Sequence, residues 1–595
     1  MVWYICFVLS VLILLVSIQN AFVLSRNYKS GQNLNAFYVT FIGVFLSISV
    51  AITPIFFESL QGHDVFALKL IMTVLIQTLQ VFTVDSSADF IFEHVVSAAT
   101  PLVEVYSAYL AVLFFIAPLL TFGFVLSLFR NIFSFVRYVC HYWSDVYVFS
   151  ALSEKSLCLA KSIKANHPKA LIVFTNVDKD EGSVISEFVD SAKELHAISF
   201  QKDIVTVNLM RHSKKTNMTF FAIDEDEGDN ITYSLKLINT FGDRENTSLY
   251  AFSNTVEGEI VFANCSPEKL KVRRINDIRS LIYSFLYNDG HEIFESAKGE
   301  DGNKKINAVI LGVGRYGTEM LKALSWFGQM DGYDINIHAF DMNPNAETYF
   351  TALCPDLMSP DYNGVSVEGE SKYKITIHSG IDVKSGSFAS EIAKIPGITF
   401  VFVCLGSDSE NIKQAANIRM LCERYGSKPV IRLVVYSPEK CSVLVGTSNY
   451  RGQEYGFEPI GDRETCYSED VIMNSELERL ALERHVKWGD EKDFWKYEYN
   501  YRSSMASAIH MNARIKCGIP GSSKKTEELT QDERDSLELL EHRRWNAYMR
   551  SEGYVYSGSL SSDSRNDLAK THHNLVGFDE LTEMDKRKDG SVGTK

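Results

Sequence analysis

The stretch that decides the fold is "AVILGVGRYGTEML", residues 308–321. An apolar run leads into Gly312, Gly314 and Gly317, which have GxGxxG spacing, and a helical pattern follows. In such a strand–loop–helix unit, the first glycine permits a tight turn and the second lets a pyrophosphate approach the backbone. The third lets helix and strand pack, and the amides at the helix start face the phosphate. The stretch therefore predicts a dinucleotide-type Rossmann unit.

Asp341 supports this interpretation. It ends the next strand-like run, "NIHAFD", 24 residues after Gly317. A carboxylate at that position can accept hydrogen bonds from ribose hydroxyls. The alternative is a glycine turn kept for packing in a site that has lost its ligand. Both interpretations predict the same fold, but only the first predicts a bound nucleotide.

Strand-like runs occur in two consecutive sets, with helical patterns between them. The first set covers 146–150, 170–178, 196–201, 218–224 and 248–253, and the second covers 307–312, 336–341, 374–380, 399–406 and 430–437. Short apolar β-branched runs separated by helices are typical of buried parallel strands. We therefore predict two tandem, doubly wound α/β domains, at 143–285 and 304–440, joined by the polar segment 296–305.

The two sets also match in detail, as expected for an internal repeat. Asp203 corresponds to Asp382, and Asn230 corresponds to Asn411. The glycine loop is not repeated, because the first domain has "SALSE" (150–154) at the equivalent turn. Its side chains and its acid oppose phosphate, so we expect this turn to bind nothing and to serve as an interface.

Residues 1–140 predict a transmembrane domain of three or four helices. Three uncharged runs, 5–24, 37–57 and 105–129, each reach the roughly 20 residues needed to cross a bilayer. No basic n-region or cleavage site marks the first run as a signal peptide. Segment 58–104 has six acidic residues and one lysine, whereas basic residues follow the first and last runs. Three spans would therefore place the N-terminus outside and the later domains in the cytoplasm.

The stretch 66–84 leaves the number of spans open. It could be a fourth span, an interfacial helix or a re-entrant helix. The re-entrant alternative, followed by the polar "TVDSSAD" (83–89), gives the order of a pore loop. Potassium filters need glycines to turn their carbonyls inward, and this stretch has none. Potassium selectivity is therefore not supported.

Charge and cysteine usage exclude some classes of protein. The net charge is −15, of which residues 1–140 carry only −1. An acidic soluble part argues against nucleic acid as a partner, because phosphate contacts need a basic face. Ten cysteines occur without a CxxC pair or zinc-ligand spacing, so we expect free thiols in a reducing compartment and no metal site.

Membrane spans followed by tandem Rossmann domains resemble the regulator-of-potassium-conductance (RCK, TrkA-N type) family over about 143–440. The resemblance rests on GxGRxG at 312–317, the strand-end Asp341 and "SDSEN" at 407–411. It implies binding of NAD(H), ATP or ADP, transmission to a membrane pore, and assembly as a dimer or tetramer. The lost first glycine loop and the missing potassium filter depart from the family. The implied nucleotide-binding residues are Gly312, Gly314, Arg315, Tyr316, Gly317, Asp341, Asp382, Gly406 and Asn411.

The C-terminal region, 465–595, reads as helical, with patterns at 475–488, 494–515 and 537–558. Its last part, about 530–590, closely resembles the small RyR domain of ryanodine receptors and bacterial proteins. The matching residues are Glu541, His542, Trp545, Gly553, Tyr554, Tyr556, Arg565, Asn566, Asp567, Lys570, His572, Leu575, Val576, Phe578 and Leu581. The chain departs from the family's usual Gly-Trp, His-Pro and Pro-Tyr pairs at 553–554, 572–573 and 577–578.

This region gathers aromatic and cationic side chains on a few short helices, which suits a planar base and a phosphate. The candidate ligand residues are His542, Arg543, Trp545, Tyr548, Tyr556 and His572. The alternative is that Trp545 and Tyr548 form the core stripe of a small helical domain, with Arg543 and Arg544 exposed to solvent.

Together these features predict a nucleotide-sensing membrane effector or ion channel in the cell inner membrane, with its C-terminal domains in the cytoplasm. The ligand would be NAD(H), an adenine nucleotide or a cyclic or signalling nucleotide, and the other partners lipid and further copies of the chain. The domain combination also resembles bacterial nucleotide-activated immune effectors in anti-phage defence.

Two alternatives stay open. One is an NAD(H)- or ATP-sensing regulator of potassium or other ion transport, and the other is a membrane-anchored NAD-dependent oxidoreductase. We expect no enzyme, because no catalytic constellation is evident. His338 and His378 lie in strand-like runs, where histidines more often belong to the core.

Overall fold

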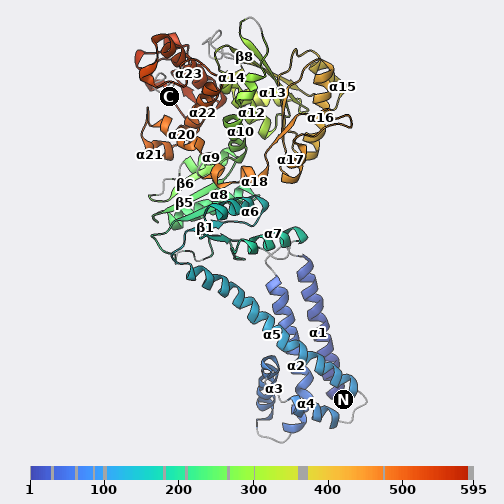
Figure 1. The fold of residues 1–595 in the computed structure, drawn as a ribbon. Coiled ribbons are helices and arrows are strands. Elements are labelled where there is room, and N and C mark those ends of the chain that lie inside the picture. Colours follow the sequence, from blue (N-terminus) through green and yellow to red (C-terminus); the bar gives the residue numbers. More distant parts are fainter. Residues whose placement is uncertain are drawn as a thin grey trace. The chain divides into compact units, whose positions relative to one another are not determined.

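A computed structural model describes most of the chain, in two compact units. The described residues are 2–27, 33–60, 65–84, 88–97, 103–177, 182–207, 209, 212–263, 265, 268–299, 302–358, 373–473 and 476–586. The first unit comprises residues 1–144 with 171–216, and the second comprises 145–170 with 217–595. Apolar helices make up most of the first unit, whereas α/β layers and a helical C-terminal region make up the second (Figure 1).

The first unit begins with five helices. They are α1 (Val2–Asn27), α2 (Asn33–Leu60), α3 (Phe66–Thr83), α4 (Ala88–Ser97) and α5 (Val103–Cys140). Four of them contain stretches long and apolar enough to cross a membrane, namely Val2–Ala21, Tyr38–Leu60, Phe66–Thr83 and Val103–Phe122. All three predicted spans are therefore helices, and the ambiguous stretch is the helix α3.

Small and hydroxylated residues hold the apolar bundle together. A side chain at Gly43 would bring its Cβ within 2.2 Å of Ser17, so α1 and α2 approach closely there. The hydroxyls of Ser10, Ser47 and Tyr109 lie 2.8 Å from one another. Because hydrocarbon offers no hydrogen-bond partner, such groups must satisfy each other between helices. The outward side chains of α1 are exposed leucine, isoleucine and valine, as expected of a lipid-facing surface.

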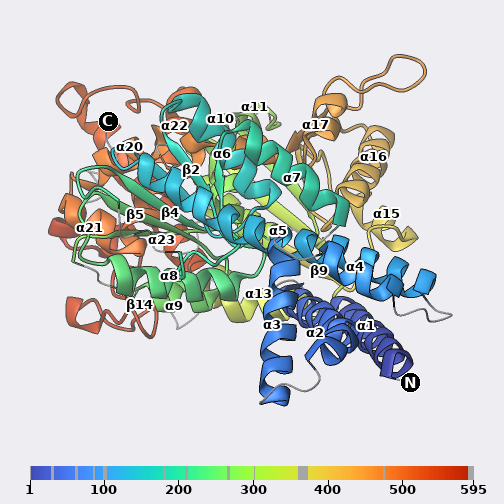
Figure 2. The same ribbon diagram turned by 90° about the horizontal axis from the view of Figure 1, so that it is seen from below.

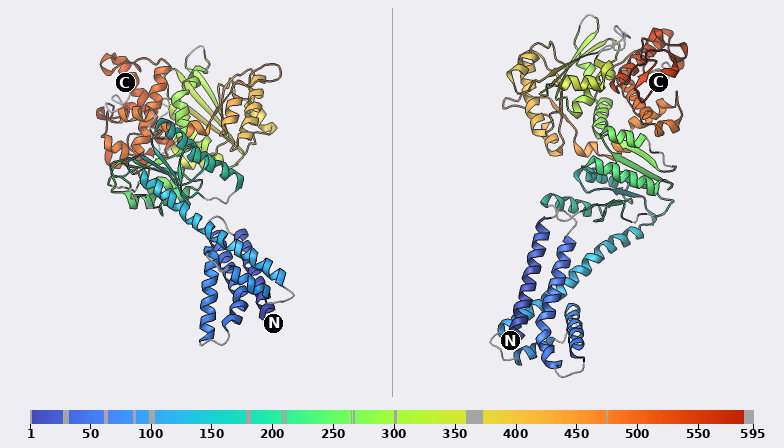
Figure 3. Two further views of the ribbon diagram at one scale, coloured as in Figure 1. Left: turned by 60° about the horizontal axis from the view of Figure 1, so that its bottom comes forward. Right: turned by 180° about the vertical axis from the view of Figure 1, so that it is seen from behind.

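Helices α3 and α4 pack against α2 and α5. Both lie toward the end of the bundle that holds Val2 (Figures 1 and 3). The polar residues 83–89 belong to a pore loop only in the re-entrant alternative, and residues 85–87 lie outside the described part of the chain.

Helix α5 is 38 residues long and continues past the apolar segment. Its last turns contact the backbone near strand β3 (Ile198–Ser199) of the first sheet. The Ser134 hydroxyl donates to the Ser199 carbonyl at 3.2 Å, and the Tyr138 hydroxyl donates to the Leu209 carbonyl at 2.9 Å. The helix that starts in the apolar bundle is therefore fastened to the edge of a soluble sheet.

Two six-stranded parallel sheets follow, with the orders β3-β2-β1-β4-β5-β6 and β12-β11-β10-β7-β8-β9. The other strands of the first sheet are β1 (Val146–Phe149), β2 (Leu171–Phe174), β4 (Met218–Ala222), β5 (Thr247–Phe252) and β6 (Lys271–Ile275). The second sheet contains β7 (Lys304–Leu311), β8 (Tyr333–Asp341), β9 (Tyr373–Ser379), β10 (Phe400–Val403), β11 (Val430–Val434) and β12 (Phe457–Ile460). Both orders are Rossmann-like, so the predicted fold class is confirmed.

Helices cover both faces of each sheet. In the first, α6 (Glu154–Asn166) lies on one face, and α8 (Glu227–Phe241) and α9 (Val256–Ala263) lie on the other (Figure 2). The remaining helices of the two α/β layers are α7 (Gly182–Glu194), α10 (Asp277–Asn288), α11 (His291–Glu295), α12 (Arg315–Phe327), α13 (Ala346–Leu353), α14 (Pro355–Met358), α15 (Gly386–Ile392), α16 (Asp408–Arg424) and α17 (Pro438–Leu444).

The sixth strand of each sheet was not predicted. Strand β6 reads "KVRRI" and β12 reads "FEPI", so neither has the continuous apolar run of a central strand. Both are edge strands, where charge and proline are tolerated. Because β12 belongs to the second sheet, that domain extends beyond the predicted boundary at residue 440.

The internal repeat is visible in matching side-chain contacts. The Asn230 amide accepts from the Asp224 amide at 2.6 Å and donates to the Phe252 carbonyl at 3.0 Å. Asn411 accepts from the Leu405 amide at 2.5 Å and donates to the Val434 carbonyl at 2.8 Å. Each asparagine thus ties the ends of two neighbouring strands together.

The C-terminal region packs against helix α12 on the side away from the second sheet. Its elements are α18 (Arg463–Cys466), α19 (Glu469–Ile472), α20 (Glu476–His485), α21 (Glu491–Lys496), α22 (Glu498–Lys516), α23 (Gln531–Ser551), β13 (Val555–Tyr556), β14 (Thr571–His572) and the short 3-10 turns Thr526–Glu528, Ser562–Ser564 and Phe578–Glu580. Helices α22 and α23 share one hydrophobic core with α12 and α10. Helix α12 is therefore buried on two sides.

Asn411→Ala should lower the free energy of unfolding by about 1–3 kcal/mol, because it leaves a buried amide and a buried carbonyl unpaired. Thermal unfolding of the full chain in detergent measures the effect. Asn345→Ala is the control, since Asn345 is exposed and its side chain makes no cap hydrogen bond. Equal melting temperatures for the two variants would contradict the role given to Asn411.

Candidate functional site

The three glycines between β7 and α12 have different surroundings. Gly312 has φ +96°, and a Cβ there would lie 2.9 Å from the Cys404 carbonyl oxygen. A Cβ at Gly317 would lie 1.8 Å from the Gly312 carbonyl oxygen. At Gly314, by contrast, no atom of the described residues would come within 4 Å of an added Cβ. The fold itself requires the first and third glycines, whereas the second leaves open space beside the start of α12.

The carboxylate of Asp341 lies directly at this loop. Its Oδ2 accepts from the Val313 amide at 2.7 Å, and its Oδ1 accepts from the Asn343 amide at 2.7 Å. The strand-end acid and the glycine loop were predicted to meet, and the structure brings them together. The two amides hold the carboxylate in one orientation at the carboxyl edge of the sheet, where ligands of such folds bind.

Arg315 adds a positive charge to the first turn of α12. Its side chain is 70% exposed and pairs with Glu227 of α8 at 3.2 Å. Glu227 also accepts from the Asn254 amide at 2.8 Å, which fixes the carboxylate. Helix-start amides and a nearby guanidinium are the groups that bind phosphate best.

Two of the predicted binding residues are held by contacts within the protein. The Tyr316 ring is half-buried and packs edge-to-face on Tyr436 with the centroids 6.2 Å apart. Burial and the neighbouring Tyr436 raise the pKa of Tyr316. Asn411 is fully buried, and both ends of its amide are held by backbone. Both side chains are therefore held by neighbouring parts of the second unit.

Asp382 and Gly406 complete the predicted set. Asp382 closes the turn after β9 by accepting from the Lys384 amide at 2.9 Å. The Ile381 amide donates to the Asp341 carbonyl at 2.9 Å, so this turn adjoins the strand-end acid. Gly406 follows β10 with φ +92° and open space around its Cα. The structure therefore gathers Gly312, Gly314, Arg315, Gly317, Asp341, Asp382 and Gly406 at the carboxyl ends of four neighbouring strands, β10, β7, β8 and β9.

At the equivalent turn of the first sheet, residues 150–154, the polar side chains form hydrogen bonds and an ion pair within the protein. The Ser153 side chain caps α6 by accepting from the Ser156 amide at 3.3 Å. The Ser150 hydroxyl accepts from the Ile223 amide at 2.8 Å. Glu154 forms an ion pair with Arg463 of α18. The turn thus contacts the rest of the protein, as expected of an interface.

The C-terminal candidates do not all face one surface. Tyr548 is fully buried and lies against Trp326 of α12, with centroids 6.3 Å apart. His542 is also fully buried, with Nε2 2.9 Å from the Val576 carbonyl oxygen. Arg543 forms an ion pair with Asp331 of the second domain. These three side chains are buried and engaged on different sides of α23, so their part in a ligand site stays a prediction.

Trp545, Tyr556 and His572 remain as a smaller group. Trp545 and Tyr556 are half-buried, and the Trp545 and His572 rings meet edge-to-face at 4.9 Å. The Asn574 amide donates to His572 Nδ1 at 3.1 Å. Burial lowers the pKa of His572 to about 3, with Arg565 adding to the shift. His572 is therefore neutral at physiological pH.

Arg544, which the core-stripe alternative places in solvent, is buried in an ionic cluster. It pairs with Glu541 at 2.6 Å, and Arg514 lies 3.9 Å from the same carboxylate. Burial alone would raise the pKa of Glu541, but Arg544, Arg484 and Arg514 lower it to about 2. Sequence patterns did not reveal this cluster because its members come from three helices, α20, α22 and α23.

A second buried ionic network reaches α12. Glu319 of α12 accepts from Arg279 at 3.0 Å, and Arg279 also pairs with Glu552 at 3.2 Å. Glu552 pairs with Arg502 of α22 at 3.0 Å. The Arg274 and Glu498 side chains join the network through a two-pronged contact at 3.0 and 3.1 Å. These residues connect the helix of the glycine loop to the end of α23 and to the first sheet.

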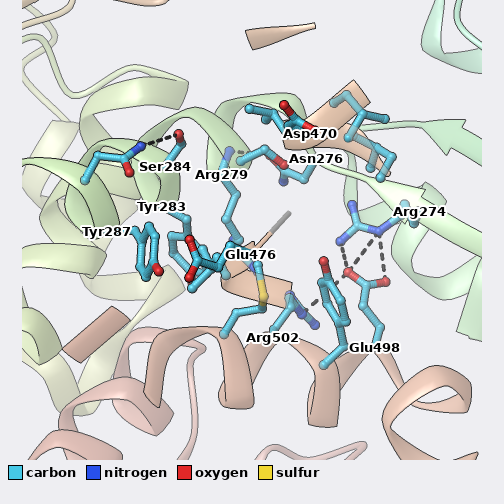
Figure 4. Close-up of a pocket in the computed structure, with 18 residues that line it drawn as sticks. Arg274, Asn276, Arg279, Tyr283, Ser284, Tyr287, Asp470, Glu476, Glu498 and Arg502 are labelled. Carbon is cyan, nitrogen blue, oxygen red and sulfur yellow. Dashed lines mark hydrogen bonds and ion pairs between the residues drawn. The ribbon is translucent and has the colours of Figure 1, made fainter. Parts of the chain in front are cut away.

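A cavity of about 240 Å³ adjoins this network. Its walls come from β6, α10, residues 470–472, 476 and 477, and α22, and Figure 4 shows the side chains around it. It was not predicted, because the contributing segments lie far apart in the chain. Within the described residues no cluster of three or more His, Cys, Asp or Glu could hold a metal ion, and the ten cysteines are free thiols.

His572→Asn should reduce the loss of stability in mild acid. Because the folded-state pKa of His572 is about 3 rather than 6.5, the unfolded chain takes up the proton first, and stability falls as the pH drops from about 6.5 toward 3. Melting temperatures of wild type and variant at pH 7 and pH 4.5 measure this. His141→Asn, at an exposed position, is the control. If the melting temperature falls between pH 7 and pH 4.5 by the same amount in His572→Asn as in wild type, the lowered pKa assigned to His572 is contradicted.

The matches between this chain and known proteins are distant. No protein-family model and no curated protein matches the chain. Among solved structures, a mutant of GsuK is 14% identical with a TM-score of 0.33, and the match covers 75% of this chain and 100% of that one. A dipicolinate synthase subunit from Bacillus halodurans is 9% identical with a TM-score of 0.20, over 56% of this chain and 92% of that one. Scores this low establish no common function.

Proposed function

We propose that this chain is a nucleotide-gated membrane protein. A nucleotide with a free ribose binds at residues 312–317, and the bound state changes the permeability of the membrane. The observation that carries the proposal is the open space at Gly314, set between the start of α12, Arg315 and the oriented carboxylate of Asp341.

The geometry favours NAD(H) or an adenine nucleotide such as ATP or ADP. The amides at the start of α12 and the Arg315 guanidinium suit a phosphate. The carboxylate of Asp341 suits a ribose diol and repels a 2′-phosphate, so NADP is disfavoured. Cyclic and signalling nucleotides that keep one phosphate and one free ribose hydroxyl satisfy the same groups.

The route to the membrane runs through α5. This helix begins in the apolar bundle and ends on the backbone near β3, to which Ser134 and Tyr138 donate hydrogen bonds. Only five residues separate its end from the first strand, β1. A ligand that prefers one arrangement of the soluble layers can therefore bias the position of this helix, by the difference in its two binding free energies.

The apolar bundle supports a pore made by several copies. Helices α3 and α4 both lie toward the end of the bundle that holds Val2, as a re-entrant segment would (Figure 3). One face of α3 is exposed and apolar, with Leu68, Met72, Leu75 and Leu79. The resemblance of the soluble part to RCK domains supports assembly as a dimer or tetramer, and the RyR-like C-terminal region favours an immune effector over a housekeeping regulator.

Gly314→Val should abolish nucleotide binding without changing stability. The position has φ −73° and no described atom within 4 Å of an added Cβ, so the variant folds, while the new side chain fills the space next to the amides. Calorimetry of the full chain in detergent with NAD(H), ATP and ADP measures affinity, and we expect a loss of roughly tenfold or more. Gly386→Val, also in open space at a helix start, is the control. Undiminished affinity in Gly314→Val would place the nucleotide elsewhere.

The same variant tests gating. Proteoliposomes of the full chain should release a trapped ionic dye when the bound nucleotide is added, and those of Gly314→Val should not. Nucleotide-induced release separates a channel or effector from an oxidoreductase, which would instead reduce an electron acceptor with NADH. Nucleotide binding without any release would refute gating and favour a partner-dependent regulator.

Glu227→Gln should strengthen nucleotide binding by up to roughly fivefold. The exchange frees Arg315 from an exposed ion pair of about 1 kcal/mol or less and removes a negative charge near the phosphate position. Titration calorimetry at low salt gives the change in Kd. Glu225→Gln alters the same charge at an exposed neighbouring position. Equal changes in Kd for the two variants would show that the loss of one negative charge explains the effect. The ion pair with Arg315 would then make no contribution.

A further inference from the structure

The cavity beside α10 has aromatic and hydroxyl-bearing walls. Tyr283 and Tyr287 lie one turn apart on α10, and Ser280 and Ser284 alternate with them along the same helix. Tyr501 of α22 belongs to the lining as well. Figure 4 shows Tyr283 and Tyr287 side by side. Flat rings with hydroxyls beside them provide both stacking surfaces and hydrogen-bond partners for a planar molecule.

The charges around the cavity are compensated. Arg274 holds Glu498 through two contacts, as the dashed lines in Figure 4 show. Arg279 pairs with Glu319 and Glu552, and Arg502 pairs with Glu552 and Glu259 at 2.9 Å. The exposed acids Asp470 and Glu476 also belong to the lining. The described arginines of the lining are each paired with carboxylates, and a phosphate would be repelled by these acids, so the cavity disfavours anions.

The volume limits the size of an occupant. Sites for drug-sized ligands span about 300–1,000 Å³, and this cavity measures about 240 Å³. A dinucleotide is too large for it, whereas a single ring system with one sugar fits.

From its shape, walls and charge, we infer that this cavity is a second ligand site, which takes an uncharged planar heteroaromatic molecule of nucleoside size. It shares no lining residue with the glycine loop. The two sites differ in chemistry, since one offers helix-start amides and a guanidinium, and the other offers tyrosine rings and hydroxyls. This assignment does not depend on the proposed function.

The two sites are physically connected. Arg279 lines the cavity and also holds Glu319, which lies on α12 four residues after Arg315. An occupant that shifts α10 against α22 must displace this buried ion pair, and a buried charge cannot be left unpaired without a large cost. Occupancy of the cavity therefore changes nucleotide affinity at the loop, and the effect is reciprocal. This coupling, unlike the site itself, rests on the proposed function.

Binding to the full chain in detergent tests the site, with adenosine, guanosine, cytidine and uridine as probes and their 5′-monophosphates as charged counterparts. We expect saturable binding of at least one nucleoside. In Gly314→Val, whose glycine loop is blocked, its monophosphate should bind more weakly by roughly tenfold or more, as for a like-charge clash. Ser284→Leu, which fills the cavity from α10, should abolish nucleoside binding. Ser442→Leu, the same exchange on the exposed side of α17, should not.

Gly314→Val separates this site from the glycine loop, because nucleoside binding should survive in that variant. If Ser284→Leu fails to fold, Tyr287→Ala replaces it as the test variant, because it removes a half-buried ring from the wall of the cavity. Failure of all four nucleosides to bind overturns the proposal. Full binding in a folded Ser284→Leu or Tyr287→Ala protein overturns it too, as does a monophosphate that binds Gly314→Val as tightly as its nucleoside does.

Discussion

The burial of helix α12 between the second sheet and the C-terminal helices is the constraint on which the rest of the soluble structure depends. Met320, Leu321, Leu324, Trp326 and Phe327 are all buried to within about one per cent of their surface. An interior packed at crystal density cannot absorb a shift of one face alone. Movement of α12 must therefore be shared by the sheet and by α22 and α23, which lie on its other side.

This position gives the glycine loop its mechanical importance. The loop forms the start of α12, and Glu319, one turn further along, is held in the ionic network with Arg279 and Glu552. A ligand bound at the loop thus contacts the first turn of a helix whose later turns are fixed by apolar packing and paired charges. In the membrane unit, α5 has the corresponding role, because its final turns are hydrogen-bonded to backbone near β3.

The two sheets show how one scaffold can be used in two ways. Asn230 and Asn411 make equivalent backbone contacts, so the strand ends are tied in the same manner in both. The turns differ. In the first sheet a serine caps its own helix and Glu154 is engaged by Arg463, whereas in the second no described side chain occupies the space at Gly314. Phosphate binding needs amides that no side chain has already taken. At the second turn Asp341 takes the Val313 amide, but no described side chain fills the space beside Gly314.

Local pattern in the sequence determined the apolar helices, ten of the twelve described strands of the two large sheets, the glycine loop and the meeting of that loop with Asp341. Each depends on neighbours in the chain or on the fixed geometry of parallel strands. The charged and proline-containing edge strands β6 and β12 were missed, because edges relax the apolar rule. Only the tertiary structure decided that Tyr548 and His542 are core residues, that Tyr316 and Asn411 serve packing, and that a cavity lies beside α10. Burial and charge pairing of these residues depend on contacts between helices far apart in the sequence. The periodicity of a single segment does not predict which helices meet.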